Sequence, residues 1–175
     1  NIVIVDIDVK ALDTYGQFPF SRDIYADWLN SSPENNAYVF NMGFTEADRF
    51  GKDSDLAEAM GTRDVILSSF VSNKSQGDKP PRGFGKLGKG DPSDWLYSYK
   101  GMRTSVVAQY AEGVGAVTVA PSVDGIVRES PLAILANQHL WPSIALEILR
   151  VWEFQPNLAI KIKDAGVEWV RMGSL

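Results

Sequence analysis

Short β-branched runs alternate with amphipathic segments along most of this chain, and this alternation constrains the fold more than any other feature. Residues 2–7, 37–44 and 64–71 are apolar runs of strand length, rich in valine, isoleucine and aromatic residues. Continuous runs of this kind are typical of strands that are buried on both faces of a sheet. The pattern therefore predicts an α/β fold of one domain, with a mixed β-sheet flanked by helices.

Capping residues and glycines mark the expected helix ends. Asp8 is placed to cap a helix over residues 9–15, which Gly16 ends in the left-handed region. Further helices are expected to begin at Ser21, at Asp53 or Ser54, and at Pro142. The last of these is predicted to bury a stripe made of Ile144, Leu146, Ile148, Leu149 and Trp152.

Two other segments have distinct patterns. Residues 158–163 and 167–172 flank Asp164-Ala165-Gly166 and predict a C-terminal β-hairpin. Residues 74–103 break the alternation with two adjacent prolines and several glycines, so a long loop is expected there. This loop has a net charge of +4, from seven basic and three acidic residues, in a chain with a net charge of −5. Between the loop and the last helix we expect a helix over 105–111, a strand over 116–120, a turn over 122–125 and extended chain over 126–136.

Composition argues against several classes of function. The chain has no cysteine, which removes disulfides, thiolate chemistry and sulfur-ligated metals. Its net charge of −5 disfavours nucleic-acid binding. His139 is the only histidine, and the glycine pattern at residues 83–88 lacks the preceding strand that a nucleotide site needs. We therefore expect no cofactor, no metal and no catalytic activity.

Charged residues near the expected strand ends are candidates for ligand binding. Asp6 and Asp8 lie at the carboxyl end of the first predicted strand, at the edge where open α/β sheets place their ligands. In the alternative, structural interpretation, Asp8 caps a helix and Asp6 pairs with an arginine, because a buried carboxylate needs a partner. Asp124 and Arg128 have the same two interpretations, with Gly125 in a tight turn between them. The candidate ligand-binding residues are Asp6, Asp8, Arg22, Asp48, Arg49, Asp124 and Arg128.

Four segments, in order along the chain, carry a family resemblance. Residues 4–8 are Ile-Val-Asp-Ile-Asp, followed at 16–22 by Gly-Gln-Phe-Pro-Phe-Ser-Arg. Residues 40–49 are Phe-Asn-Met-Gly-Phe-Thr-Glu-Ala-Asp-Arg. Gly113-Val114-Gly115 precedes Asp-Gly-Ile-Val-Arg at 124–128, and Pro-Ser-Ile-Ala-Leu-Glu stands at 142–147. Together they resemble the second class of CHASE domains, the extracellular sensory modules of bacterial cyclases and histidine kinases.

The resemblance implies an extracytoplasmic domain, periplasmic or extracellular. Transmembrane helices outside this segment would hold it and relay its signal to a cytoplasmic adenylate cyclase, histidine kinase or Ser/Thr kinase. The chain starts with Asn1 and has no apolar run of spanning length, so we expect it to be part of a larger receptor. The expected partners are a small-molecule ligand, or membrane headgroups at the basic loop, and a homodimer in the parent receptor. The alternatives are a structural dimerisation module and an α/β enzyme.

Overall fold

A parallel sheet forms the centre of the computed structural model, which describes residues 1–74, 80, 84–118 and 124–174. Strand β2 (Asp64–Ser72) lies between β1 (Ala37–Phe40) and β6 (Gly113–Val117), and both pair with it in parallel. The end of β2 also pairs antiparallel with β5 (Gly101–Arg103). The carboxyl ends of β1, β2 and β6 therefore meet at one edge of this sheet.

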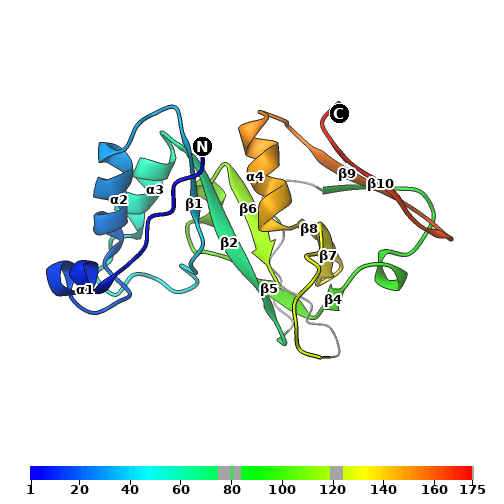
Figure 1. Ribbon diagram of the computed structural model, residues 1–175, viewed down its shortest axis with the longest axis horizontal. Helices are drawn as coiled ribbons and strands as arrows, with labels where there is room; N and C mark the ends of the chain where they lie inside the picture. The colour runs from blue at the N-terminus through cyan, green and yellow to red at the C-terminus, as the bar shows by residue number, and fades with distance from the viewer. Residues whose placement is uncertain (75–79, 81–83, 119–123, 175) are drawn as a thin grey trace.

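Helices cover both faces of the central sheet (Figure 1). Helices α2 (Arg22–Ser31) and α3 (Asp53–Met60) pack side by side on one face, and α4 (Ile144–Trp152) packs on the other against β6 and β2. Helix α1 (Val9–Tyr15) lies beyond α2 at one end of the molecule. This arrangement confirms the predicted α/β class.

Two smaller sheets lie on the far side of α4. One has the order β10-β9-β3 and the other the order β4-β7-β8. The antiparallel pair β9–β10 is the predicted C-terminal hairpin, and Gly166, with a φ of 136°, begins its second strand. The bounds are β3 Phe84–Leu87, β4 Ser98–Tyr99, β7 Ala133–Ala136, β8 His139–Pro142, β9 Leu158–Lys163 and β10 Gly166–Met172.

The predictions for the helix ends are largely confirmed. Asp8 caps α1 by accepting a hydrogen bond from the Ala11 backbone N–H at 3.0 Å, and Gly16 follows the helix with a φ of 85°. Helix α3 begins at Asp53 and is followed by Gly61. Pro142 does not begin α4, because it closes β8, and the Ser143 hydroxyl caps the helix instead.

The prediction of a buried first strand over residues 2–7 is wrong. Residues 1–8 form no strand, and the side chains of Ile2 and Ile4 are 95% and 88% exposed. Of residues 1–8, only Ile7 packs against the large hydrophobic core around the central sheet. A β-branched run favours an extended chain, whereas both its pairing as a strand and its burial depend on which strand edge it meets, and the local sequence does not encode that edge.

Three other predictions differ in detail. The expected loop over 74–103 contains β3, β4, β5 and a 3-10 helix, η1 (Pro92–Asp94), because its short strands pair with segments remote in sequence. The helix expected over 105–111 is reduced to a 3-10 turn, η2 (Ala108–Tyr110). A second hairpin joins β7 to β8 through Asn137 and Gln138, both with positive φ. The expected turn over 122–125 and strand over 116–120 lie partly outside the described residues.

Two glycines allow α4 to lie very close to β6. A Cβ placed on Gly115 would lie 2.4 Å from the Ile144 Cα, and one placed on Gly113 would lie 2.9 Å from the Glu147 carboxylate. Only glycine fits at such distances, because the clash at Gly115 is with backbone atoms that cannot rotate away. This contact, which we call the β6–α4 seam, joins the central sheet to the last third of the chain.

We predict that Gly115→Ala lowers the free energy of unfolding by about 1–3 kcal/mol, the usual cost of overpacking a core. Gly61→Ala is the matched control, because a Cβ there meets nothing closer than 3.4 Å and the backbone is helical. The control should stay within about 0.5 kcal/mol of the parent. Urea unfolding of the two variants measures both values, and equal stabilities would contradict the close approach.

Candidate functional site

The N-termini of α2 and α3 meet the loop that follows β1, and their polar side chains form what we call the α2–α3 junction. Its centre is Arg22, the first residue of α2, which is buried. The Arg22 guanidinium stacks on the Phe44 ring at 4.4 Å and donates a hydrogen bond to the Glu46 carbonyl at 3.2 Å. Its Nε lies 3.4 Å from Asp53 Oδ1, at the start of α3. Arg22 therefore connects both helices to the loop.

Two carboxylates organise the loop around Arg22. Asp53 Oδ2 accepts a hydrogen bond from the Asp48 backbone N–H at 2.8 Å, and Asp48 Oδ2 accepts one from the Lys52 N–H at 3.0 Å. The Ser21 hydroxyl, predicted to cap α2, instead donates to Asp48 at 3.5 Å. Arg49 is exposed and donates to the Pro19 carbonyl at 3.4 Å. The junction thus holds three of the predicted site residues, Arg22, Asp48 and Arg49.

Part of this polar junction has no hydrogen-bond partner within the described structure. Arg22 Nε and Asp53 Oδ1 are close enough for an ion pair, but neither atom makes a hydrogen bond. Buried polar atoms of this kind are uncommon in proteins, and a bound water, ion or ligand can supply the missing hydrogen bond. Beside them, burial raises the pKa of the Tyr25 hydroxyl, against the opposing effects of a Phe20 backbone contact and the Arg22 charge.

The other predicted residues lie outside the junction. Asp8 is the cap of α1, and Asp6 is exposed, with no arginine recorded beside it among the described residues. Arg128 forms a two-pronged pair with Asp124, with both distances at 2.8 Å. The segment 124–128, which holds this exposed pair, lies away from α2 and α3 in Figure 1, and the Arg128 guanidinium lowers the pKa of Asp124. The structure therefore separates the seven residues into a junction, two N-terminal aspartates and an isolated ion pair.

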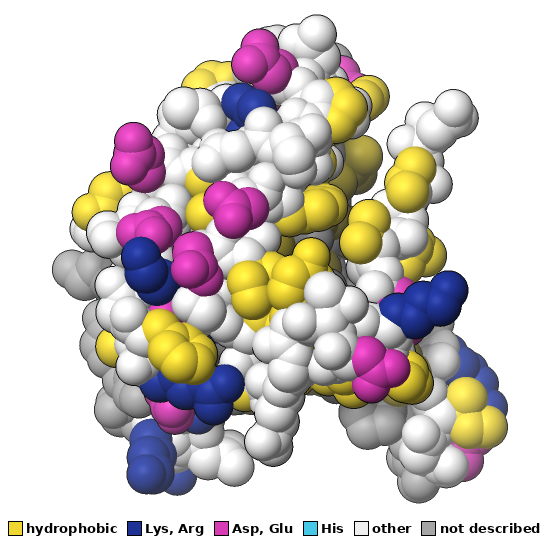
Figure 2. Space-filling view, turned by 90° about the vertical axis from the view of Figure 1, so that its left-hand side faces the viewer, with side chains coloured by type: hydrophobic (Ala, Val, Ile, Leu, Met, Phe, Trp, Pro, Cys, Tyr) yellow, Lys and Arg dark blue, Asp and Glu magenta, His cyan; other side chains and the backbone are white. Residues whose placement is uncertain are grey.

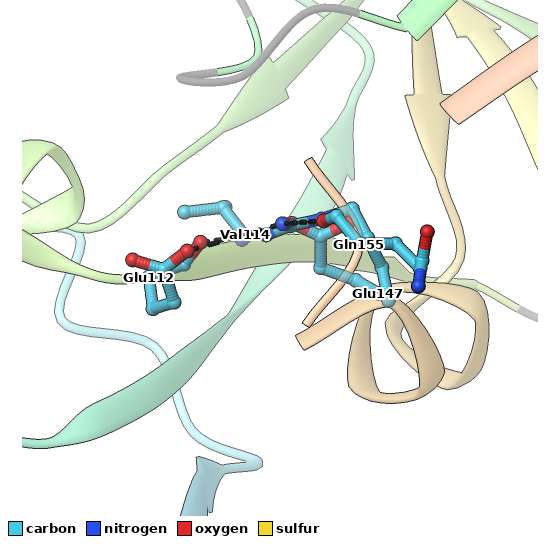
Figure 3. A network of polar contacts seen from close by, with 5 residues as sticks. Glu112, Val114, Glu147 and Gln155 are labelled. Carbon is cyan, nitrogen blue, oxygen red and sulfur yellow. Dashed lines mark hydrogen bonds and ion pairs between the residues drawn. The ribbon is translucent and has the colours of Figure 1, made fainter. Parts of the chain in front are cut away.

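A buried polar network beneath α4 was missed at the level of sequence. Glu147 and Arg150 are each 2% exposed. Arg150 Nε and Nη2 donate to the two Glu147 carboxylate oxygens at 2.9 and 2.8 Å, and its Nη groups also reach the carbonyls of Glu112 and Gln155 at 2.6 and 2.9 Å. Glu147 Oε1 accepts the Val114 N–H of β6 at 3.3 Å (Figure 3). Both charges are thus paired and hydrogen-bonded, as burial requires.

This network corrects the predicted buried stripe of α4. Leu149 and Trp152, expected inside, are 52% and 56% exposed, whereas Glu147 and Arg150 face the sheet. The helix is turned because Gly113 leaves room on β6 for the Glu147 side chain. The sequence does contain a signal for such a pair. It is a glutamate and an arginine three residues apart on a helix, together with a strand that has two glycines at alternate positions.

A further concave region of about 830 Å³ lies beside the C-terminal strands. Gln155, Asn157 and Arg171 supply its polar groups, and Phe84 and Leu158 line its apolar side. None of the predicted site residues lines it. It is therefore separate from the α2–α3 junction.

Comparison with known families assigns the chain. The family model described as the CHASE2 domain matches residues 1–172. The chain belongs to the CHASE2 domain family. No curated protein and no solved structure matches it. CHASE2 is a sensory family of signalling receptors rather than a catalytic one, and its domains are typically extracellular, so this chain is a sensory domain. None of the described helices has the length and hydrophobicity of a membrane span.

The family assignment and the geometry together give the motif residues their roles. In this CHASE2 domain, Gly113-Val114-Gly115 and residues 142–147 build the β6–α4 seam, and the segment over 40–49 builds the α2–α3 junction. Asp8 acts as a helix cap. Most of the residues that carried the resemblance therefore hold the fold together.

We predict that Arg150→Met lowers the free energy of unfolding by about 3–5 kcal/mol, because it leaves the Glu147 carboxylate buried without its partner. The double variant Glu147→Leu/Arg150→Met should be more stable than this single variant, because it removes both buried charges. Chemical unfolding of the three proteins provides the comparison. A single variant as stable as the parent would contradict the buried pair.

Proposed function

We propose that this CHASE2 domain is the extracytoplasmic sensing part of a bacterial transmembrane receptor, and that it relays a small-molecule signal to a cytoplasmic cyclase or kinase. The observation that carries the proposal is the family match over residues 1–172, since the family is sensory. Composition supports it, because a domain without cysteine suits an oxidising compartment.

The α2–α3 junction is the ligand site that we propose. It lies where two helix N-termini converge at the carboxyl edge of a parallel sheet, which is the usual ligand position in open α/β folds. Arg22 Nε and Asp53 Oδ1, which lie 3.4 Å apart, supply a buried donor and a buried acceptor that make no hydrogen bond, and Asp48 and Arg49 supply charges nearer the surface. A ligand held by these groups would bridge α2 and the loop before α3.

Signalling would follow from a population shift. α2 and α3 are joined at this end by a few polar contacts to the loop, such as Arg22 with Asp53 and Ser21 with Asp48. A ligand that binds one arrangement of the two helices more tightly than another shifts the equilibrium by that difference in affinity. The β6–α4 seam lies on the opposite face of the sheet and provides a fixed support.

The location is tested by labelling a single cysteine. The chain has no cysteine, so Lys89→Cys, at an exposed position, introduces one thiol into it. In intact cells that make the full-length protein, we expect a membrane-impermeant maleimide to label this variant above the unsubstituted parent. Labelling that appears only after lysis would place the domain in the cytoplasm and overturn the proposal.

The site is tested by the output of the full-length protein, read as cyclic nucleotide or phosphorylated product. We expect Arg49→Ala to change this output while leaving stability within about 0.5 kcal/mol of the parent, because Arg49 is exposed. Arg171→Ala, another exposed arginine on β10, is the matched control and should leave the output unchanged. Equal outputs from both variants would exclude the α2–α3 junction as the ligand site.

A further inference from the structure

The N-terminal residues 2–6 form an arm that stands away from the body of the domain. Its four apolar residues, Ile2, Val3, Ile4 and Val5, are between 66% and 95% exposed. Figure 2 shows this arm beside the body with an open gap between them, and hydrophobic side chains lie on both sides of the gap. A run of four β-branched residues has a strong preference for the strand conformation, and here it is left in water.

The edge of β1 is a ready partner for this arm. β1 pairs with β2 on one side, and among the described residues no strand pairs with its other side. The side chain of Val39 on β1 is 40% exposed. An uncovered edge presents unpaired N–H and C=O groups that a further strand satisfies.

The chain path favours a parallel pairing at this edge. In Figure 1 the arm and β1 both run from the top of the view downward, and α1 and α2 connect the two. Because α2 and α3 lie on the same face, a crossover from the arm through α2 to β1 has the same hand as the crossover from β1 through α3 to β2. Successive crossovers of one hand are the rule in parallel sheets.

The pattern of side chains also restricts the register. Ile7 packs on the core that contains α2, and alternation then turns Val5 and Val3 toward the same face and Ile4 toward the other. On β1, Tyr38 and Phe40 contact Trp28 of α2, so Val39 faces away from it. Ile4 therefore lies on the same face as Val39, and of the registers that alternation allows we choose the one that pairs these two residues.

In this register Asp6 lies opposite Asn41, the residue that follows β1. Asn41 Oδ1 accepts a hydrogen bond from Ser68 of β2 at 3.3 Å, so its amide NH₂ is the group that can donate to a carboxylate. Closing the arm would form a polar row of Asp6, Asn41 and Ser68 across the carboxyl edge of the sheet. This row gives the exposed Asp6 a hydrogen-bond donor.

We propose that residues 2–6 close onto the free edge of β1 as a parallel strand, with Ile4 opposite Val39 and Asp6 opposite Asn41. The domain then has an open state, with the arm in water, and a closed state in which the central sheet has one more parallel strand. Its use as a signalling switch rests on the proposed sensor function, because α2 begins at the ligand site and connects the arm to β1. The closure itself does not depend on that function.

Disulfide trapping in the purified chain tests the closure. Adjacent strands lie about 4.8 Å apart, within the reach of a disulfide, and the parent has no cysteine to interfere. We expect Ile4→Cys/Val39→Cys to form an intramolecular disulfide at least about tenfold faster than Val5→Cys/Val39→Cys, because a shift of one residue moves the thiol to the other face. Trypsin digestion and mass spectrometry under non-reducing conditions identify the bond.

Three outcomes would overturn the proposal: equal rates for the two pairs, no intramolecular bond, or a bond only between two copies of the chain. A second variant tests the polar row. Asn41→Asp places a carboxylate beside Asp6 and should slow trapping of Ile4→Cys/Val39→Cys by repulsion at neutral pH. An unchanged rate would contradict the register. The assay needs no receptor, so failure here is distinguishable from failure of the maleimide and output tests.

Discussion

The close contact between α4 and β6 is the constraint on which the rest of the fold depends. Gly113 and Gly115 let α4 lie so close to β6 that the Glu147 side chain packs directly against Gly113. The Glu147 carboxylate then accepts a hydrogen bond from the Val114 N–H of β6. A buried carboxylate at that position requires a buried cation, which Arg150 supplies. Arg150 in turn holds the carbonyls of Glu112 and Gln155, which precede β6 and β9. One ion pair thus joins the central sheet to the C-terminal sheet.

The two faces of the central sheet are held in different ways, and this difference suits a sensor. On one face the β6–α4 seam combines close packing with a fully paired buried charge. On the other face, the N-termini of α2 and α3 are tied by an incomplete polar junction around Arg22. Motions that a ligand controls come from the less stable parts of a structure. The arm over residues 2–6, whose apolar side chains are exposed, is such a part.

Local signals in the sequence predicted local structure well. The capping by Asp8, the start of α3 at Asp53 and the C-terminal hairpin followed from residues adjacent in sequence. The exposure of residues 2–6, the short strands within 74–103 and the inward turn of Arg150 depend on remote partners, which one sequence does not reveal. For the site, the sequence singled out Arg22, Asp48 and Arg49 but also grouped them with Asp124 and Arg128, which the fold places elsewhere.

Native-state hydrogen exchange at Val114 tests the importance of the β6–α4 seam most directly. Its N–H is bound to Glu147 inside the seam, so we expect it to exchange only through global unfolding, with a free energy equal to that from chemical denaturation. The Ala11 N–H, held by Asp8 at the exposed helix α1, should exchange through local opening at lower free energy. A Val114 amide that exchanges as readily as Ala11 would show that the seam opens on its own, and would contradict this account.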